Sequence, residues 1–261
     1  MESKFIKVGN SISFKSKTDG LDYNLEAGKV YTVTVDSYTD AISLNIAPDL
    51  QLPAKIYETS EDKMFISKVI NRYKTTAEGT TGVLLSGLKG SGKTVMIKNI
   101  AIQSELPIIL IDKGFRPRFM TKLFNELADV EVCVIFDEID KLGEDYDDDY
   151  LLRILDGANS SGKKLVLCTC NDEDEISPYL KDRCSRIRYW KKFDEISASM
   201  IQEVLEDKLA DKTEIKPLTD FILEEFGVAS FDNINAFVDE VNAYPNETYE
   251  NLFNDMNLTS K

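Results

Sequence analysis

A glycine-rich segment in the first half of the chain has the residues and the spacing of a phosphate-binding loop. It fits the pattern G-x-x-x-x-G-K-[S/T], in which glycines let backbone N–H groups turn inward around a polyphosphate. The residues that we expect to contact the nucleotide are Gly87, Leu88, Lys89, Gly90, Ser91, Gly92, Lys93, Thr94 and Val95. In this pattern the Lys93 ammonium reaches the β- and γ-phosphates, and the Thr94 hydroxyl ligates Mg²⁺. The sequence therefore predicts a nucleoside triphosphate site.

Two acidic residues downstream supply the second half of such a site. Asp137 and Glu138 directly follow the apolar segment 132–136, which is typical of a buried strand. A carboxylate at the C-terminal end of a neighbouring strand can hold the metal, and the next acid can polarise the attacking water. We therefore assign Asp137 to the metal and Glu138 to general-base catalysis. The alternative is an acidic loop with no catalytic role.

The segments around these residues predict the elements that would position them. Segment 81–86 is a short apolar run, as expected for a parallel strand that leads into the loop, and 95–102 continues as a helix. The positive N-terminus of that helix would face the phosphates. Strand and helix patterns alternate to about residue 190, with further strands at 108–111 and 164–169. This alternation predicts an α/β fold with a parallel sheet.

Three regions are expected along the chain. Residues 1–56 contain short alternating segments that indicate a small antiparallel β domain, 57–192 form the α/β core, and 193–261 form a helical lid. Candidate N-caps for the lid helices, each with a hydroxyl that can accept from the first turn, are Ser197, Thr219 and Ser230.

Composition narrows the class of protein further. The 261 residues are 43% hydrophobic and 30% charged, with no apolar run of membrane-spanning length and no apolar signal segment, so we expect a cytoplasmic protein without membrane contact. The chain has no histidine, which excludes a Cys/His zinc site and His-dependent nucleophiles. The net charge is −15, and from residue 193 onwards 16 acidic residues stand against 4 lysines. A broad DNA-binding face is therefore not expected in the lid.

Further segments resemble the AAA+ ATPase superfamily, over about residues 52–249. Segment 150–157 is similar to the L-L-x-x-L-D-G helix of the AAA clade, and the strand at 164–170 leads to Asn171 at the position of the sensor-1 polar residue. Segment 180–189 resembles the arginine-finger segment of clamp-loader subunits, with Asp182 where serine is usual. The small single module with an unfamiliar β segment also resembles phage-encoded AAA ATPases, whose location would be the host cytoplasm.

The resemblance implies ATP and Mg²⁺ as ligands and a ring-like homo-oligomer, with a hexamer as the expected form. It implies that Asn171 holds the lytic water near the γ-phosphate, and that Arg183 is an arginine finger on the neighbouring subunit's ATP, with Arg186 as the alternative. The sequence also departs from clamp loaders in the lid. There is no Lys or Arg between 217 and 260, where those proteins carry a sensor-2 arginine.

The leading functional expectation is remodelling of a protein substrate, and the alternative is a nucleic-acid-directed motor or loader. Phe115, in the loop after the second core strand, is a candidate for gripping a substrate, with packing beneath the next helix as the alternative. Its neighbours Lys113, Arg116 and Arg118 favour contact with a phosphate backbone. A third possibility, a nucleotide switch without turnover, is disfavoured by the intact set of catalytic residue types.

Overall fold

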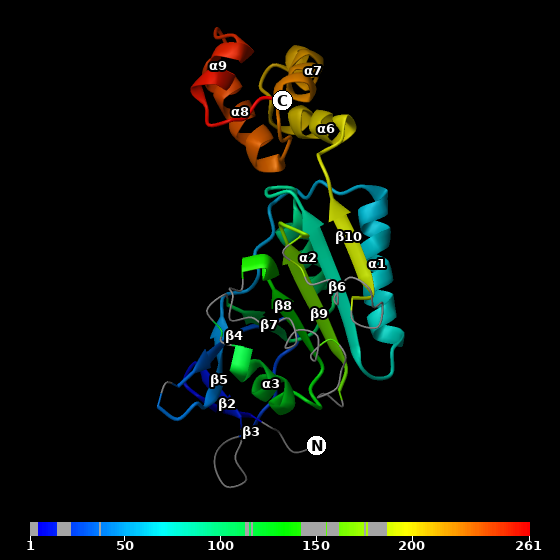
Figure 1. The fold of residues 1–261 in the computed structure, drawn as a ribbon, viewed down its shortest axis with the longest axis vertical. Coiled ribbons are helices and arrows are strands. Elements are labelled where there is room, and N and C mark those ends of the chain that lie inside the picture. The colour runs from blue at the N-terminus through cyan, green and yellow to red at the C-terminus, as the bar shows by residue number, and fades with distance from the viewer. Residues whose placement is uncertain are drawn as a thin grey trace.

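The structure, a computed structural model, describes residues 5–14, 22–36, 38–112, 115, 117–141, 155, 162–174, 176 and 187–261. An α/β body lies between a group of helices at one end and antiparallel strands at the other (Figure 1). The C-terminus belongs to the helical end of the molecule. No helix in these ranges is long and apolar enough to cross a membrane.

Parallel strands form one half of the sheet, with β10 at its outer edge, which confirms the predicted α/β class. They are β6 (Thr80–Gly87), β7 (Ile108–Ile111), β8 (Val132–Phe136), β9 (Lys164–Cys170) and β10 (Tyr189–Phe193). Their order across the sheet is β10-β6-β9-β8-β7. Because β9 lies between β6 and β8, the carboxyl ends of these three strands meet at one edge, where open α/β sheets bind their ligands.

The N-terminal strands do not form a separate sheet, contrary to expectation. These strands are β1 (Phe5–Val8), β2 (Ser11–Phe14), β3 (Asp22–Tyr23), β4 (Val30–Val35) and β5 (Ile42–Ala47). They are antiparallel among themselves, but β4 also pairs with β7 in parallel, with Val30 opposite Ile108. Within the described residues the result is one continuous sheet of ten strands. The pairing covers the edge of β7, which would otherwise present unpaired backbone groups. The boundary at residue 56 stays a prediction.

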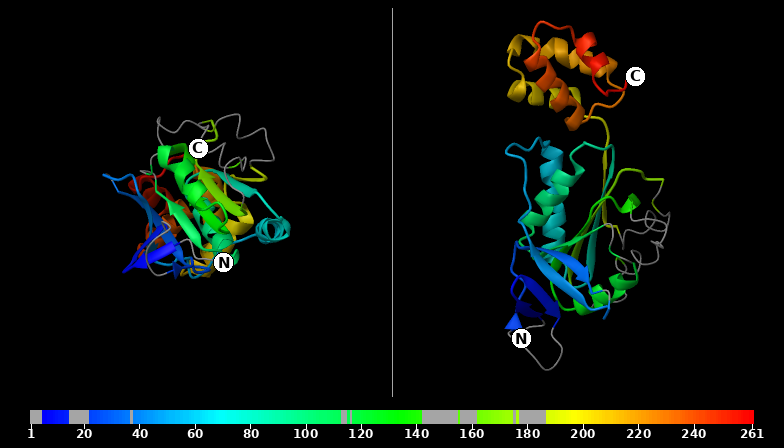
Figure 2. Two further views of the ribbon diagram at one scale, coloured as in Figure 1. Left: turned by 90° about the horizontal axis from the view of Figure 1, so that it is seen from below. Right: turned by 90° about the vertical axis from the view of Figure 1, so that its left-hand side faces the viewer.

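Helices cover both faces of the parallel strands. The helices α1 (Ser60–Thr75) and α2 (Lys93–Gln103) lie against one face, and α3 (Pro117–Glu126) lies against the other (Figure 2). Alternate residues of β8 divide between the two layers: Cys133 and Ile135 pack with α1 and α2, and Val134 and Phe136 pack with α3. This is the pattern of a sheet that is buried on both sides.

Four helices form the lid, with an aromatic core of their own. They are α6 (Ala198–Lys208), α7 (Ile215–Glu225), α8 (Phe231–Ala243) and α9 (Tyr249–Asp255). Ser197 and Ser230 are N-caps of α6 and α8, as expected. Thr219 is not a cap, because α7 begins one turn earlier, directly after the 3₁₀ turn Lys212–Glu214. Thr219 is buried inside α7, and its hydroxyl donates to the Ile215 carbonyl at 2.7 Å.

Candidate nucleotide site

The glycine-rich loop joins β6 to α2 and has the backbone that its sequence requires. Gly87, Gly90 and Gly92 have φ angles of 119°, 70° and 100°, a region that side chains disfavour. A Cβ atom at Gly87 would lie 2.0 Å from the Phe193 carbonyl oxygen, so β10 also forbids a side chain there. Gly92 is the N-cap residue of α2 and offers no side chain to it. The first N–H groups of α2 are therefore positioned for an anion.

The loop lysine is turned back onto its own loop. Lys93 is buried, and its Nζ donates to the carbonyl oxygens of Gly87, at 2.7 Å, and Leu88, at 2.6 Å. Burial lowers the pKa of Lys93, and nearby acidic groups, among them Asp140 and Asp137, oppose that shift. A polyphosphate in the loop would offer the ammonium charged oxygens in place of neutral carbonyls, and such hydrogen bonds are stronger.

The remaining loop residues also fit a phosphate ligand. Ser91 is 5% exposed, and within the described part of the chain its buried hydroxyl oxygen has no hydrogen-bond partner. A buried polar atom of this kind calls for a partner that a bound ligand can supply. Lys89 and Thr94 are exposed, and Val95 is half-buried in the first turn of α2. All four border the same cavity.

A hydroxyl and a carboxylate meet beside the loop. Thr94 Oγ1, on the first turn of α2, lies 3.5 Å from Asp137 Oδ1, which directly follows β8. Oxygen atoms of this kind are the ligands that Mg²⁺ prefers, and Mg²⁺ commonly takes only one or two protein ligands in addition to substrate phosphates. The pair therefore fits a magnesium ion bound together with a nucleotide.

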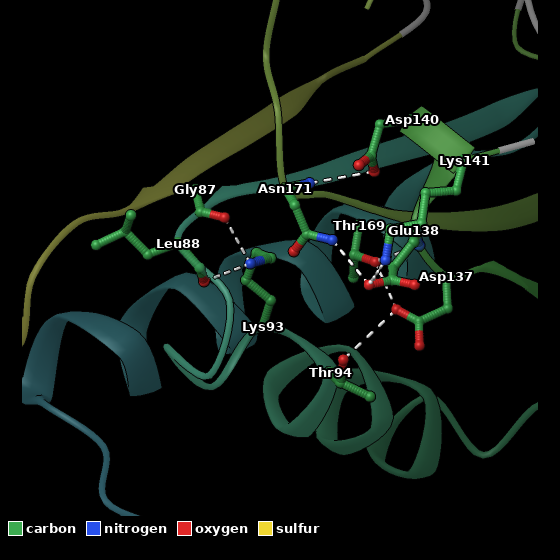
Figure 3. A network of polar contacts seen from close by, with 10 residues as sticks. All are labelled: Gly87, Leu88, Lys93, Thr94, Asp137, Glu138, Asp140, Lys141, Thr169 and Asn171. Carbon is green, nitrogen blue, oxygen red and sulfur yellow. Dashed lines mark hydrogen bonds and ion pairs between the residues drawn. The ribbon is translucent and has the colours of Figure 1, made fainter. Parts of the chain in front are cut away.

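Glu138 and Asn171, from different strands, come together at the same edge (Figure 3). Asn171 Nδ2 donates to Glu138 Oε1 at 2.8 Å, and the Asn171 N–H donates to Asp140 Oδ1 at 3.1 Å. Lys141, in the 3₁₀ turn Ile139–Lys141, donates to the same Glu138 oxygen at 2.6 Å. The Glu138 carboxylate thus lies between an amide and an ammonium group.

Three residues of this network were not predicted from the sequence: Asp140, Lys141 and Thr169. Thr169 lies on β9, two positions before Asn171 and on the same side of the strand. Its hydroxyl contacts the Asp137 carboxylate and the Glu138 backbone. Lys141 follows Glu138 by three residues. The available signals were the two-residue spacing along a strand and the three-residue spacing within a turn, and neither is specific to a site.

The cavity at this edge extends from the loop to the lid, with a volume of about 940 Å³. Tyr57, from the segment before α1, and Phe231, the first residue of α8, stack on its border with ring centres 5.7 Å apart. The Phe231 N–H donates to the Gly90 carbonyl at 2.9 Å. Burial and the hydrogen bond to Asp207 raise the pKa of Tyr57 to about 12, so its hydroxyl keeps its proton and donates to that carboxylate. The lid therefore contacts both the glycine-rich loop, through Gly90, and the segment before α1, through Tyr57.

Several predicted residues are placed elsewhere or are not described. Arg183 and Arg186 lie outside the described residues, as does segment 150–157 apart from the buried Leu155. Phe115 is 6% exposed and packs against Phe119, with ring centres 6.4 Å apart. In this structure Phe115 therefore follows the packing alternative and offers no exposed ring to a substrate.

The central part of the chain matches a known protein family. Residues 83–192 match the model of the family described as ATPase family associated with various cellular activities (AAA). Two curated relatives have the name ATPase family gene 2 protein. The one from Schizosaccharomyces pombe is 37% identical over 127 residues, which are 41% of this chain and 16% of the relative. The one from Saccharomyces cerevisiae is 27% identical over 120 residues, which are 38% of this chain and 15% of the relative.

The strand order, the glycine-rich loop and the two acids after β8 define a P-loop nucleotide-binding protein. The match makes that class specific: the α/β core, which contains residues 83–192, is an ATPase domain of the AAA+ superfamily. This chain covers only 16% and 15% of the length of the two relatives. What those proteins do as wholes is therefore a separate question for this chain.

Proposed function

We propose that this chain is a Mg²⁺-dependent ATPase that works as a ring-like homo-oligomer in the cytoplasm, expected to be a hexamer, and remodels a protein substrate. The observation that carries the proposal is the meeting of the loop, Asp137, Glu138 and Asn171 at one edge of the sheet. Binding groups alone would suit a nucleotide carrier. A carboxylate and an amide placed together next to them suit hydrolysis.

In the proposed binding step, the loop holds the polyphosphate of ATP. The N–H groups at the start of α2 face the phosphates, and Lys93 exchanges its bonds to the Gly87 and Leu88 carbonyls for phosphate oxygens. Thr94 and Asp137 would hold Mg²⁺, which neutralises charge on the phosphates when it is bound. Binding therefore requires the lysine to swing away from its position in this structure.

In the proposed chemical step, Glu138 accepts a proton from the attacking water. Asn171, which contacts Glu138 at 2.8 Å, holds the water in line with the γ-phosphate. In this structure the Lys141 ammonium group forms an ion pair with the Glu138 carboxylate. Release of that ion pair would accordingly precede catalysis.

A protein substrate is favoured over a nucleic acid by charge. The chain has a net charge of −15, most of it in the lid, and nucleic-acid binding depends on basic neutralisation of phosphates. Of the basic residues that follow β7, Arg118 forms an ion pair within the chain, with its guanidinium 3.5 Å from the Asp40 carboxylate. We infer that a phosphate backbone is the weaker candidate.

The first test separates nucleotide binding from hydrolysis. Lys93→Ala should weaken binding of a fluorescent ATP analogue by several kcal/mol, at least about 100-fold, because the lost contact is charge-assisted and shielded from water. Glu138→Gln should bind the analogue normally and hydrolyse ATP at least about 100-fold more slowly. A folded Lys93→Ala variant with unchanged affinity would remove the loop from the site, and a fully active Glu138→Gln variant would remove the base.

The second test concerns the substrate class. The ATPase rate is measured alone and with unfolded protein, single-stranded DNA, duplex DNA or RNA, with Glu138→Gln as the inactive control. We expect stimulation by the unfolded protein and none by the nucleic acids. Strong stimulation by a nucleic acid would replace the remodeller with the motor or loader.

A further inference from the structure

Strand β9 lies between β6, which leads into the loop, and β8, which precedes Asp137 and Glu138. It has a hydroxyl group at Thr169, between Cys168 and Cys170. Strand β9 is buried along its whole length, and Thr169 on it is 1% exposed. A buried hydroxyl is unfavourable unless it is hydrogen-bonded. Thr169 has partners for both its donor and its acceptor function, and both partners belong to the proposed site.

The direction of each hydrogen bond follows from the single proton of the Thr169 hydroxyl. Thr169 has one O–H group, and it donates to Asp137 Oδ1 at 2.5 Å. A lone pair on the same oxygen accepts the Glu138 N–H at 2.7 Å. One side chain from a neighbouring strand therefore holds both the carboxylate of the proposed metal ligand and the backbone of the proposed base.

Each bond acts on a feature that the site needs. The Asp137 oxygen that accepts from Thr169 is also the one that lies 3.5 Å from Thr94, so the bond sets the rotation of the carboxylate towards the loop. Glu138 has a φ of 56°, in the left-handed region that side chains other than glycine seldom adopt. The N–H bond to Thr169 supports this turn. In the turn, the Glu138 side chain reaches Asn171.

We propose that Thr169 is a positioning residue that couples the metal ligand to the general base, an inference that rests on the proposed ATPase function. Thr169 acts through Asp137 and Glu138 and has no direct part in the chemistry. Groups that orient a metal ligand from behind typically change metal affinity or activity 10–100-fold when they are removed. The competing explanation is that Thr169 only fills a slot in a buried strand.

The test removes the hydroxyl and keeps the shape. Thr169→Val preserves volume and β-branching, so the strand is retained while both bonds are lost. Thr169→Ser is the matched control, because it keeps the hydroxyl and loses only a methyl group. Binding of a fluorescent ATP analogue is titrated with Mg²⁺ for each protein, kcat and KM for ATP are measured, and thermal unfolding is recorded.

We expect the Mg²⁺ concentration for half-maximal analogue binding to rise about 10-fold or more in Thr169→Val, with affinity in EDTA unchanged. We expect kcat to fall by a similar factor while KM changes little, and Thr169→Ser to behave like the unmutated protein. Equal losses in Val and Ser variants, or a Val variant with unchanged Mg²⁺ dependence and kcat, would overturn the proposal.

A second pair of variants applies if Thr169→Val does not fold. Thr169→Ser and Thr169→Ala both lack the methyl group and differ only in the hydroxyl. The same difference in Mg²⁺ dependence is expected between them, and its absence would count against a positioning role. If the unmutated protein does not hydrolyse ATP, the proposed activity fails, and the Mg²⁺ dependence of binding still decides whether Thr169 positions the ligand.

Discussion

At the scale of single residues, Glu138 is held in a position that does not leave it free for water. Its carboxylate accepts from Lys141 at 2.6 Å and from Asn171 at 2.8 Å. The Lys141 side chain is 41% exposed and that of Glu138 is 24% exposed, so both partners of the ion pair are partly accessible to solvent. Asn171 has a proposed catalytic role, whereas Lys141 competes with the water for the same oxygen. We therefore regard Lys141 as a restraint on the base.

Replacement of Lys141 should release that restraint. Partly exposed ion pairs contribute about 0.2–1 kcal/mol, so Lys141→Met should raise the basal ATPase rate by a factor of up to about five, with ATP affinity unchanged. Lys141→Arg keeps the charge and serves as the control. Steady-state kinetics on the three proteins measure the effect. A slower Lys141→Met enzyme would show that Lys141 assists the reaction.

The parts of the site that could be predicted are those written in contiguous residues. The loop from Gly87 to Thr94 has a fixed spacing because one turn of backbone must enclose the phosphates, and the acids follow a buried strand for the same topological reason. Thr169 and Lys141 could not be predicted in this way. The role of Thr169 depends on the register between β8 and β9, and that of Lys141 depends on the left-handed turn at Glu138. Neither is visible in local sequence.

At the scale of elements, the lid meets the loop through the start of α8. The Phe231 N–H donates to the Gly90 carbonyl, and a Cβ atom at Gly90 would lie 2.8 Å from the Asp232 carboxylate. The lid therefore brings a negative charge to the phosphate loop. A carboxylate near bound phosphates opposes their binding, by about 1 kcal/mol for two unit charges 4 Å apart in water.

Neutralisation of Asp232 should tighten nucleotide binding. We expect Asp232→Asn to lower the Kd of an ATP analogue by a factor of roughly five at low salt, with a smaller effect at high salt because ions screen the repulsion. Asp239→Asn, which removes an exposed charge from the same helix, is the control. Equal effects from both substitutions would mean that the net charge of the lid, and not the position of Asp232, is responsible.

The elements were predicted unevenly, for physical reasons. Ser197 and Ser230 cap helices as expected because capping depends on residues within one turn. Thr219 was wrong because a 3₁₀ turn ahead of α7 moves the start of that helix. The sequence contains the hydroxyl in all three cases, and only the surrounding turns distinguish a cap from an interior residue that bonds to the carbonyl four residues earlier.

At the scale of the whole molecule, the N-terminal strands and the strands that carry the nucleotide site belong to one sheet. The pairing of β4 with β7 joins residues far apart in the chain, and Tyr31 on β4 is fully buried in the same core as α3. The alternating segments in residues 1–56 predicted strands but did not predict the parallel partner of β4. A period of two indicates a buried face and does not identify the neighbouring strand. The antiparallel region is therefore an extension of the core sheet.

The basic residues around the cavity are the candidates within this chain for a cation that stabilises the transition state. Three of the six lysines at its border pair with carboxylates: Lys55 with Asp207 at 3.4 Å, Lys191 with Asp62 at 2.9 Å, and Lys192 with Glu173 at 3.5 Å. The other three are Lys89, Lys93 and Lys208. The sequence has no Lys or Arg from 217 to 260 to provide a cation from α8. The proposal of a transition-state cation from another subunit rests on the sequence resemblance, which gives Arg183 that role, with Arg186 as the alternative.

Mixing of variants tests whether the site is shared between subunits. Arg183→Ala should bind ATP normally and hydrolyse it roughly 10³–10⁵-fold more slowly, since an arginine finger stabilises charge on the γ-phosphoryl oxygens. Lys93→Ala subunits keep the finger and lack the loop contact. Mixed oligomers should therefore recover activity that neither variant shows alone, and Arg186→Ala in place of Arg183→Ala identifies which arginine acts. If demonstrably mixed oligomers stay inactive, or a dilute monomer is fully active, neither arginine acts across subunits and the ring loses its main support.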